Sequence, residues 1–179
     1  IDARLAATGK KLFEANCSKC HGTYGDKETY PNLLIPTHII KTDSTLVETN
    51  FSSPQFIEWF KQSWFRTGKR KADLVPFRGY IAPPLDGVWI TAPYLHNGSV
   101  PTLETLLNSK KRPAFWERNF EKPTYDYNEV GWGYKQHEKQ VNKSTYNTNL
   151  KGYGNHGHTF GDKLTDEERK SVIEYLKTL

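Results

Sequence analysis

The sequence predicts one mainly α-helical domain that spans residues 1–179 and carries long ordered loop insertions. Two observations predict this fold class. Apolar residues recur at helical spacing near both ends of the chain, and the segments between them are rich in glycine and proline. A chain of 179 residues usually forms one domain and can bury a core without disulfide cross-links.

Two helices are predicted in the first third of the chain, over residues 2–16 and 54–66. Three apolar residues share one face of the first helix: Leu5, Leu12 and Phe13. Pro54 suits the first position of the second helix. Aromatic residues recur every four positions along it: Phe56, Phe60 and Trp64. We expect this aromatic stripe to pack against the core.

Proline and glycine predict an ordered loop over residues 76–101, followed by a short helix over 101–107. Residues 108–155 show little periodicity, which predicts a long loop insertion. Insertions of this length usually carry function or wrap a site. The clearest helix covers residues 165–179, where a T-x-x-E capping box opens an apolar face at helical spacing.

Composition and charge narrow the class of function. The net charge is +5, and basic residues are spread along the chain, which favours solvated faces over a nucleic-acid interface. A basic surface also suits an acidic protein partner. The chain contains no run of about 18 apolar residues, which is the length needed to span a membrane. The start of the chain at Ile1 lacks the pattern of a signal peptide, and we expect such a peptide to have been removed.

Both cysteines of the chain lie in one short segment, ANCSKCHGTYG. A zinc site would need a second pair of ligands, and a thioredoxin-like pair would open a helix after a strand. A disulfide between Cys17 and Cys20 would close too short a loop to stabilise much. His21 completes C-x-x-C-H, the attachment signature of c-type haem. We therefore expect one haem c bound covalently through Cys17 and Cys20, with His21 as an iron ligand.

Haem is attached to this motif outside the cytoplasm. The motif therefore also predicts a periplasmic or extracellular protein. A bound apolar cofactor would supply buried surface that a chain with only 36% hydrophobic residues lacks.

The terminal helices around C-x-x-C-H resemble those of a class I cytochrome c. The segment YIAPPLDGVWITAPYLHNGSVPTLETLL resembles a stretch of bacterial dihaem cytochrome c peroxidases, MauG-like proteins and dihaem rubber oxygenases. The blocks KRPAFWERNFEKPTYDYNEVGW and YNTNLKGYGNHGHTFGDKLTDEERKSVIEYLKTL are most similar to the rubber-oxygenase branch. This chain has one haem motif and resembles only the C-terminal haem half of those dihaem proteins. The resemblance implies a class I cytochrome c-like helical haem domain, whose haem usually passes electrons.

The chain contains no methionine, so the other side of the iron needs a different ligand. Besides an open position, five histidines are candidates: His38, His96, His137, His156 and His158. Class I cytochromes place this ligand in the loop before the last helix, which here reads GNHGHTFG. By resemblance to the G-H-x-[F/Y]-G form of the relatives we expect His158, with His156 and His96 as alternatives. Two imidazoles would lower the reduction potential relative to a His/Met cytochrome c.

The resemblance also implies neighbours of the haem. His96, in PYLHNG, would lie beside the haem and hydrogen-bond a propionate together with Arg78. Three aromatic residues are expected either in the haem wall or in the ordinary core: Phe77, Trp89 and Tyr94. We interpret His38 and His137 as surface residues.

Three functions are consistent with the sequence. The first is a cytochrome that carries single electrons between protein partners. The second is a peroxidase-like or oxygenase-like haem enzyme with an open or labile iron site. The third is a haem-bearing module of a larger redox complex, which is compatible with the first.

Overall fold

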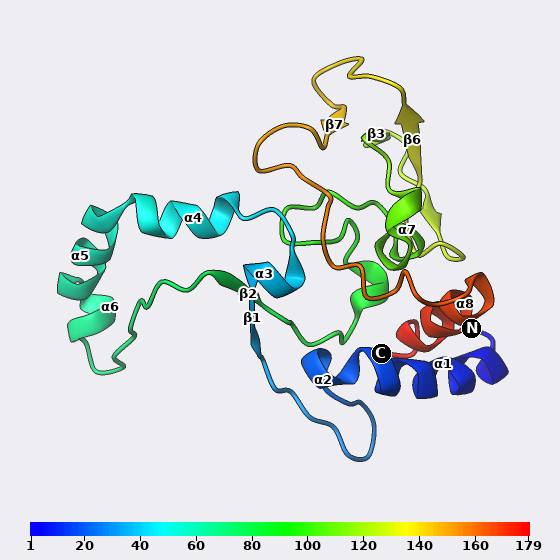
Figure 1. Ribbon diagram of the computed structural model, residues 1–179, viewed down its shortest axis with the longest axis horizontal. Helices are drawn as coiled ribbons and strands as arrows, with labels where there is room; N and C mark the ends of the chain where they lie inside the picture. Colours follow the sequence, from blue (N-terminus) through cyan, green and yellow to red (C-terminus); the bar gives the residue numbers. More distant parts are fainter.

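The computed structural model describes residues 1–179. About 36% of the residues are helical and 14% are in strands, so the predicted mainly helical class holds only loosely. A pair of helices from the two ends of the chain lies at one side of the molecule, at the lower right in Figure 1, and the other elements are short. None of the helices combines the length and the apolar character needed to cross a membrane.

The terminal helices α1 (Ala3–Asn16) and α8 (Asp166–Leu176) pack against each other, and both were predicted (Figure 1). The carboxylate of Asp2 caps α1 by accepting hydrogen bonds from the first free backbone amides of the helix. The predicted capping box opens α8, because the side chains of Thr165 and Glu168 each accept a backbone N–H of the other residue. These caps fix where both helices begin.

Gly9 lies where α1 crosses α8. A Cβ atom at this position would be 1.9 Å from the carbonyl oxygen of Ser171 and 3.0 Å from the Cβ atom of Tyr175. The two backbones therefore approach as closely as they do only because residue 9 has no side chain.

Replacing Gly9 by alanine is expected to lower the free energy of unfolding by about 2 kcal/mol, because overpacking forces the helices apart. The gain in helix propensity, about 1 kcal/mol at an uncrowded site, offsets only part of this cost. Denaturant unfolding measures the change, and Thr8→Ala on the exposed side of α1 is the matched control. A Gly9→Ala variant as stable as the native chain would contradict the close crossing.

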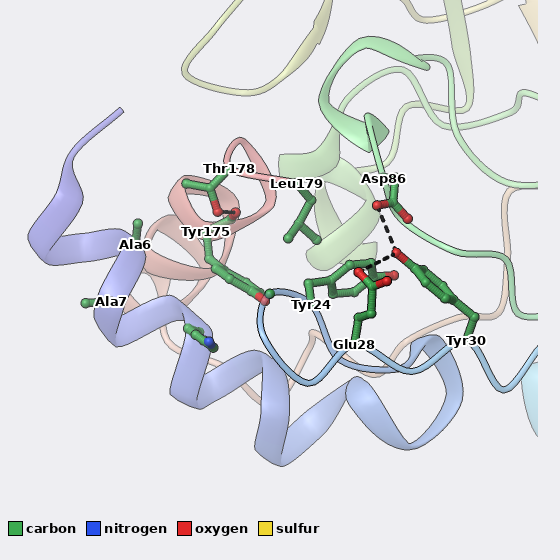
Figure 2. A pocket seen from close by; sticks show the side chains of 11 residues that line it. Ala6, Ala7, Tyr24, Glu28, Tyr30, Asp86, Tyr175, Thr178 and Leu179 are labelled. Atoms are coloured by element: carbon green, nitrogen blue, oxygen red, sulfur yellow. Dashed lines mark hydrogen bonds between the residues drawn. The ribbon is translucent and has the colours of Figure 1, made fainter.

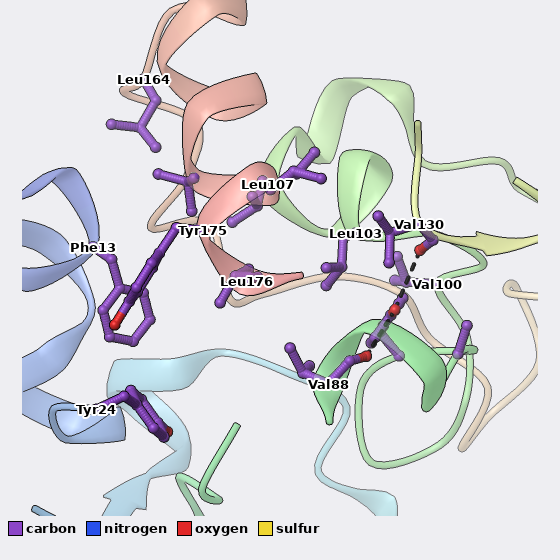
Figure 3. Packing of buried hydrophobic residues seen from close by; sticks show 14 residues of the cluster. Phe13, Tyr24, Val88, Val100, Leu103, Leu107, Val130, Leu164, Tyr175 and Leu176 are labelled. Atoms are coloured by element: carbon purple, nitrogen blue, oxygen red, sulfur yellow. Dashed lines mark hydrogen bonds between the residues drawn. The ribbon is translucent and has the colours of Figure 1, made fainter. Parts of the chain in front are cut away.

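The hydrophobic core extends from this helix pair into the middle of the chain (Figure 3). Phe13 of α1 is 1% exposed, and its ring centroid lies 5.3 Å from that of Tyr175 in α8. Helix α7 (Leu103–Leu107) adds Leu103, which is also 1% exposed. The core thus joins the terminal helices to the short helix predicted after residue 101.

Two short strands, β1 (Leu34–Pro36) and β2 (Gly79–Ile81), form an antiparallel pair in which Ile35 lies opposite Tyr80. The chain between them contains four helices: α3 (Thr37–Ile40), α4 (Thr45–Ser52), α5 (Pro54–Gln62) and α6 (Trp64–Thr67). The helix predicted over 54–66 is therefore two helices, broken at Ser63, whose backbone is extended.

The aromatic stripe predicted to pack against the core does not do so. No residue of α5 or α6 is buried, and Trp64 is 72% exposed. Helical spacing places these rings on one side of a helix but does not supply an element to cover them.

The segment 108–155, predicted as a loop insertion, contains short strands. Strand β3 (Phe115–Arg118) lies between β6 (Tyr134–His137) and β7 (Tyr146–Asn147) in an antiparallel sheet. The remaining elements are a second pair and two single-turn 3₁₀ helices: β4 (Tyr125–Asp126), β5 (Gly131–Trp132), η1 (Val88–Ile90) and η2 (Ser109–Lys111). Strands of two to four residues give too little alternation for a sequence pattern to reveal.

Candidate functional site

The C-x-x-C-H motif folds into one helical turn at the end of α1. Helix α2 (Ser18–His21) begins directly after Cys17, whose carbonyl oxygen accepts the backbone N–H groups of Cys20 and His21, each at 3.1 Å. The turn ends at Gly22, where φ is 82° and a Cβ atom would be 1.8 Å from the carbonyl oxygen of Thr29. The local fold therefore holds all three motif side chains on one rigid turn.

The imidazole of His21 is oriented by a backbone carbonyl. Its Nδ1 lies 2.9 Å from the carbonyl oxygen of Pro83. A carbonyl oxygen can only accept, so Nδ1 carries the proton and Nε2 keeps its lone pair. Metal-binding histidines are commonly held in this way by a second hydrogen bond.

Cys17 and Cys20 are both half-buried. Burial raises the pKa of Cys17 to about 11, against a small opposing effect of Lys163. The thiol is therefore protonated at neutral pH. This environment lacks the lowered pKa of a reactive redox cysteine.

His158 occupies an unusual place in the loop before α8. Its backbone is left-handed, with φ at 45°, and its N–H donates to the carbonyl oxygen of Ile40 at 2.8 Å. The buried Nδ1 of its ring has no hydrogen-bond partner. Burial, followed by the charges of His21 and Arg112, lowers the pKa of His158 to about 4. The ring is therefore neutral at physiological pH, as a metal ligand must be.

The fold brings the rings of His21 and His158 together from opposite ends of the chain. Their centroids are 6.2 Å apart and their planes are inclined by 62°. With about 2 Å from a metal to a ring nitrogen and about 1 Å from that nitrogen to the centroid, two imidazoles on one metal ion have centroids about 6 Å apart. This spacing fits an iron atom between the two rings.

The guanidinium group of Arg112 holds the loop of His158 in place. It donates to two carbonyl oxygens at the end of α7, those of Thr105 at 3.1 Å and Leu106 at 2.9 Å. It also donates to three carbonyl oxygens of the loop, in residues 155, 157 and 158, at distances from 2.6 to 3.1 Å. A planar group with five N–H donors can bridge two backbone segments in this way.

The carboxylate of Asp43 fixes the start of the same loop. One oxygen accepts the N–H of Thr45 at 2.8 Å, and the other accepts those of Gly152 at 3.1 Å and Gly154 at 3.2 Å. The side-chain amide of Asn97 donates to the carbonyl oxygens of the same two glycines. Asp43 and Asn97 therefore hold the loop at residues 152 and 154, and Arg112 holds it at residues 155, 157 and 158.

His96 and Arg78 have partners within the protein. The ring of His96 stacks on Tyr80, with centroids 4.0 Å apart. The guanidinium of Arg78 pairs with Glu48 at 3.2 Å and lies 3.9 Å above the ring of Phe51. No hydrogen bond joins Arg78 to His96 in the structure, so their shared role at a propionate rests on the resemblance alone.

The three aromatic residues expected in the haem wall lie in different settings. Tyr94 is buried in the hydrophobic core, where its hydroxyl lies 3.1 Å from the carbonyl oxygen of Val88 and 3.2 Å from that of Val130. Trp89 is half-buried at the edge of the same core. Phe77 is 40% exposed. Of the two expected settings, the haem wall and the ordinary core, the structure places Tyr94 in the core.

The other histidines differ in exposure. His38 is exposed, as expected, and so is His156. His137, interpreted as a surface residue, instead has a side chain only 11% exposed, and its Nε2 lies 3.5 Å from a carboxylate oxygen of Glu117. The interpretation of His137 was wrong because strand β6 packs it against β3.

A separate open pocket of about 420 Å³ lies between α1, residues 24–30 and the C-terminus (Figure 2). The hydroxyl of Tyr30 donates there to the carboxylates of Asp86 at 3.2 Å and Glu28 at 3.5 Å. None of the predicted site residues lines this pocket. It is therefore distinct from the space between the two histidine rings.

Two family models match the chain. The model described as cytochrome c matches residues 6–61, which include most of α1 and the C-x-x-C-H turn. The model described as RoxA-like, cytochrome c-like matches residues 79–117, which include Arg112. The second match covers the first of the three blocks on which the sequence resemblance rested, residues 80–107, and the start of the second.

Two curated relatives come from Sinorhizobium fredii. The uncharacterized protein y4iJ is 35% identical over 130 residues, which cover 66% of this chain and 21% of y4iJ. The uncharacterized protein y4iM is 34% identical over 155 residues, which cover 74% of this chain and 34% of y4iM. The chain thus spans about a fifth and a third of these relatives.

Cytochrome c domains carry covalently bound haem c, and the residues of the C-x-x-C-H turn and His158 fit that group. The matches confirm the resemblance drawn from the sequence. The chain is a c-type cytochrome that resembles RoxA-like haem domains, and hence a haem-binding redox protein.

Proposed function

We propose that the chain is an extracytoplasmic electron carrier with one haem c, attached through Cys17 and Cys20 and ligated by His21 and His158. The single observation that carries this proposal is the approach of the two histidine rings to 6.2 Å. The partner would be another redox protein or the rest of a larger redox complex. The length of the relatives, three to five times that of their matched parts, supports the second kind of assembly.

When bound, haem c supplies a couple that accepts and returns one electron. The chain contributes two neutral imidazoles, and a hydrogen bond orients that of His21. The carbonyl of Pro83 keeps the proton of His21 on Nδ1, and burial keeps His158 unprotonated. An iron atom held by both His21 and His158 would leave no open position for peroxide or dioxygen. This arrangement favours a carrier over the peroxidase-like or oxygenase-like alternative.

Replacing His158 by alanine is expected to convert the oxidised haem from a low-spin to a predominantly high-spin state, because one of two imidazole ligands is lost. Optical and electron paramagnetic resonance spectra of the purified haem-loaded protein measure the change. His156→Ala is the matched control, because His156 lies two residues away and is exposed. That control should keep the low-spin spectrum.

Two results would overturn the ligand assignment. One is a His158→Ala variant that stays low-spin, and the other is a His156→Ala variant that becomes high-spin. A native protein that is already high-spin would support the enzyme alternative. The mass of the intact chain, produced in a host that matures c-type cytochromes, should exceed the polypeptide mass by one haem.

A further inference from the structure

Residues 45–75, which we call the arm, project away from the rest of the chain (Figure 1). The arm consists of α4, α5 and α6, which come between strands β1 and β2 in the sequence. Val47 in α4 is its one buried helical residue, and α5 and α6 contain none. The arm therefore exposes side chains that a core would otherwise cover.

Large aromatic rings make up this exposed surface. Phe56 is 49% exposed, Trp59 56% and Trp64 72%. The rings stack on one another, with centroids 5.7 Å apart for Phe56 and Trp59 and 3.9 Å apart for Trp64 and Phe65. Exposed apolar patches of this kind mark interaction sites.

Unpaired positive charges follow these rings in the chain. Lys61 lies 3.9 Å from Glu58, and Arg66 pairs with Asp73 at 2.6 Å. The next three basic residues are exposed and form no ion pair: Lys69, Arg70 and Lys71. Basic residues are spread over the chain as a whole, but this part of the arm presents a local excess of positive charge.

We propose that the arm binds an anionic phospholipid surface peripherally, with the aromatic rings at the headgroup level and the free cations on the phosphates. Tryptophan and phenylalanine on one face of a short helix, with lysine and arginine close by, suit this interface. Protein interfaces are also enriched in aromatic residues and arginine but are depleted in lysine, so the free lysines Lys69 and Lys71 favour lipid over an acidic protein as the occupant.

This binding would leave the haem site free. Helices α5 and α6 lie far from α2, which carries His21 (Figure 1). A peripherally bound chain could therefore still present its haem site to a redox partner. The proposal does not depend on the assignment of His158 as a ligand.

The test is cosedimentation of the haem-loaded full chain with vesicles, read from the haem absorbance in the pellet. We expect binding to vesicles of phosphatidylcholine with phosphatidylglycerol, and little binding to phosphatidylcholine alone. Raising the salt concentration should weaken the binding, because exposed charges are screened. The triple variant Lys69→Gln, Arg70→Gln, Lys71→Gln should bind about 100-fold more weakly, at about fivefold per cation.

A second triple variant is the control, because it removes the same charge at another place. It replaces exposed and unpaired lysines of β6 and the following loop: Lys135→Gln, Lys139→Gln, Lys143→Gln. It should bind as the native chain does. The double variant Trp59→Ser, Trp64→Ser should lose roughly tenfold in affinity while its haem spectrum stays native. The unchanged spectrum shows that the chain remains folded.

Three results would overturn the proposal. The first is the absence of binding to anionic vesicles, as an acidic protein partner would predict. The second is equal loss of binding in both triple variants, which would indicate attraction by net charge alone. The third is a dimer on size exclusion that the Trp59→Ser, Trp64→Ser variant abolishes, because a second copy would then cover the arm.

Discussion

Replacing Arg112 by glutamine is expected to lower the free energy of unfolding by about 4 kcal/mol and to loosen the loop that carries His158. The guanidinium donates to five backbone carbonyl oxygens, two at the end of α7 and three in the loop. A shorter neutral amide can reach only some of them. The remaining carbonyl oxygens lose their charged donor, and the position of Arg112 is half-buried.

The effect should extend from stability to the haem. One of the five carbonyl oxygens belongs to His158 itself, and another to Gly157. If His158 is an iron ligand, a looser loop lets its ring leave the iron more often. The Arg112→Gln variant should then bind added cyanide at least about tenfold faster than the native protein, because each 1.4 kcal/mol in the cost of opening changes an equilibrium tenfold.

Stopped-flow absorbance measures cyanide binding, and denaturant unfolding measures stability. Arg112→Lys should fall between the native chain and Arg112→Gln, because a lysine keeps the charge but cannot bridge both segments. Arg70→Gln, an exposed change of the same type, should alter neither quantity. If Arg112→Gln is destabilised but binds cyanide at the native rate, Arg112 stabilises the fold without positioning His158.

The sequence allowed prediction of the terminal helices and of the haem-attachment motif. Strong local signals define them: a capping box at Thr165, apolar residues at helical spacing around Phe13, and the C-x-x-C-H motif that begins at Cys17. The meeting of His21 and His158 followed from a family resemblance, because no local pattern connects residues so far apart. The structure brings these two rings together, and the sixth-ligand role of His158 stays a prediction.

Arg112 and Asp43 were missed for a common physical reason. Their partners are backbone groups, and every residue carries a carbonyl and nearly every one an N–H, so the letters do not mark which ones are used. The local signals were weak: Arg112 precedes a proline after a predicted helix, and Asp43 precedes α4, a helix that was not predicted from the sequence. The short strands β3 to β7 were missed because two to four residues show too little alternation for a sequence pattern to reveal.

The aromatic stripe over α5 and α6 was misinterpreted for the opposite reason. The sequence pattern was strong and correctly placed Phe56 and Phe60 in a helix. Periodicity describes one face of one helix, and burial needs a second element against that face. Figure 1 shows no such element beside the arm.

Replacing Asp43 by asparagine is expected to lower the free energy of unfolding at pH 7 by about 2 kcal/mol. The carboxylate accepts three backbone N–H groups, and it is 7% exposed. Burial alone would raise the pKa of Asp43, but hydrogen bonds from Thr45, Gly154 and Gly152 outweigh it and lower the pKa. An asparagine presents one oxygen and one NH₂ group, and the latter would face an N–H donor.

The lowered pKa fixes the sign of the pH dependence. The contribution of Asp43 is complete above its unfolded pKa of about 3.9 and is lost as the pH falls through the lower folded value. The native chain and Asp43→Asn should therefore differ at pH 7 and pH 5 and converge below about pH 4, as the native carboxylate takes up a proton. Denaturant unfolding across this pH range, with the exposed Asp26→Asn as control, measures the difference. A stability difference that stays constant down to pH 2 would mean that the carboxylate charge does not hold the loop.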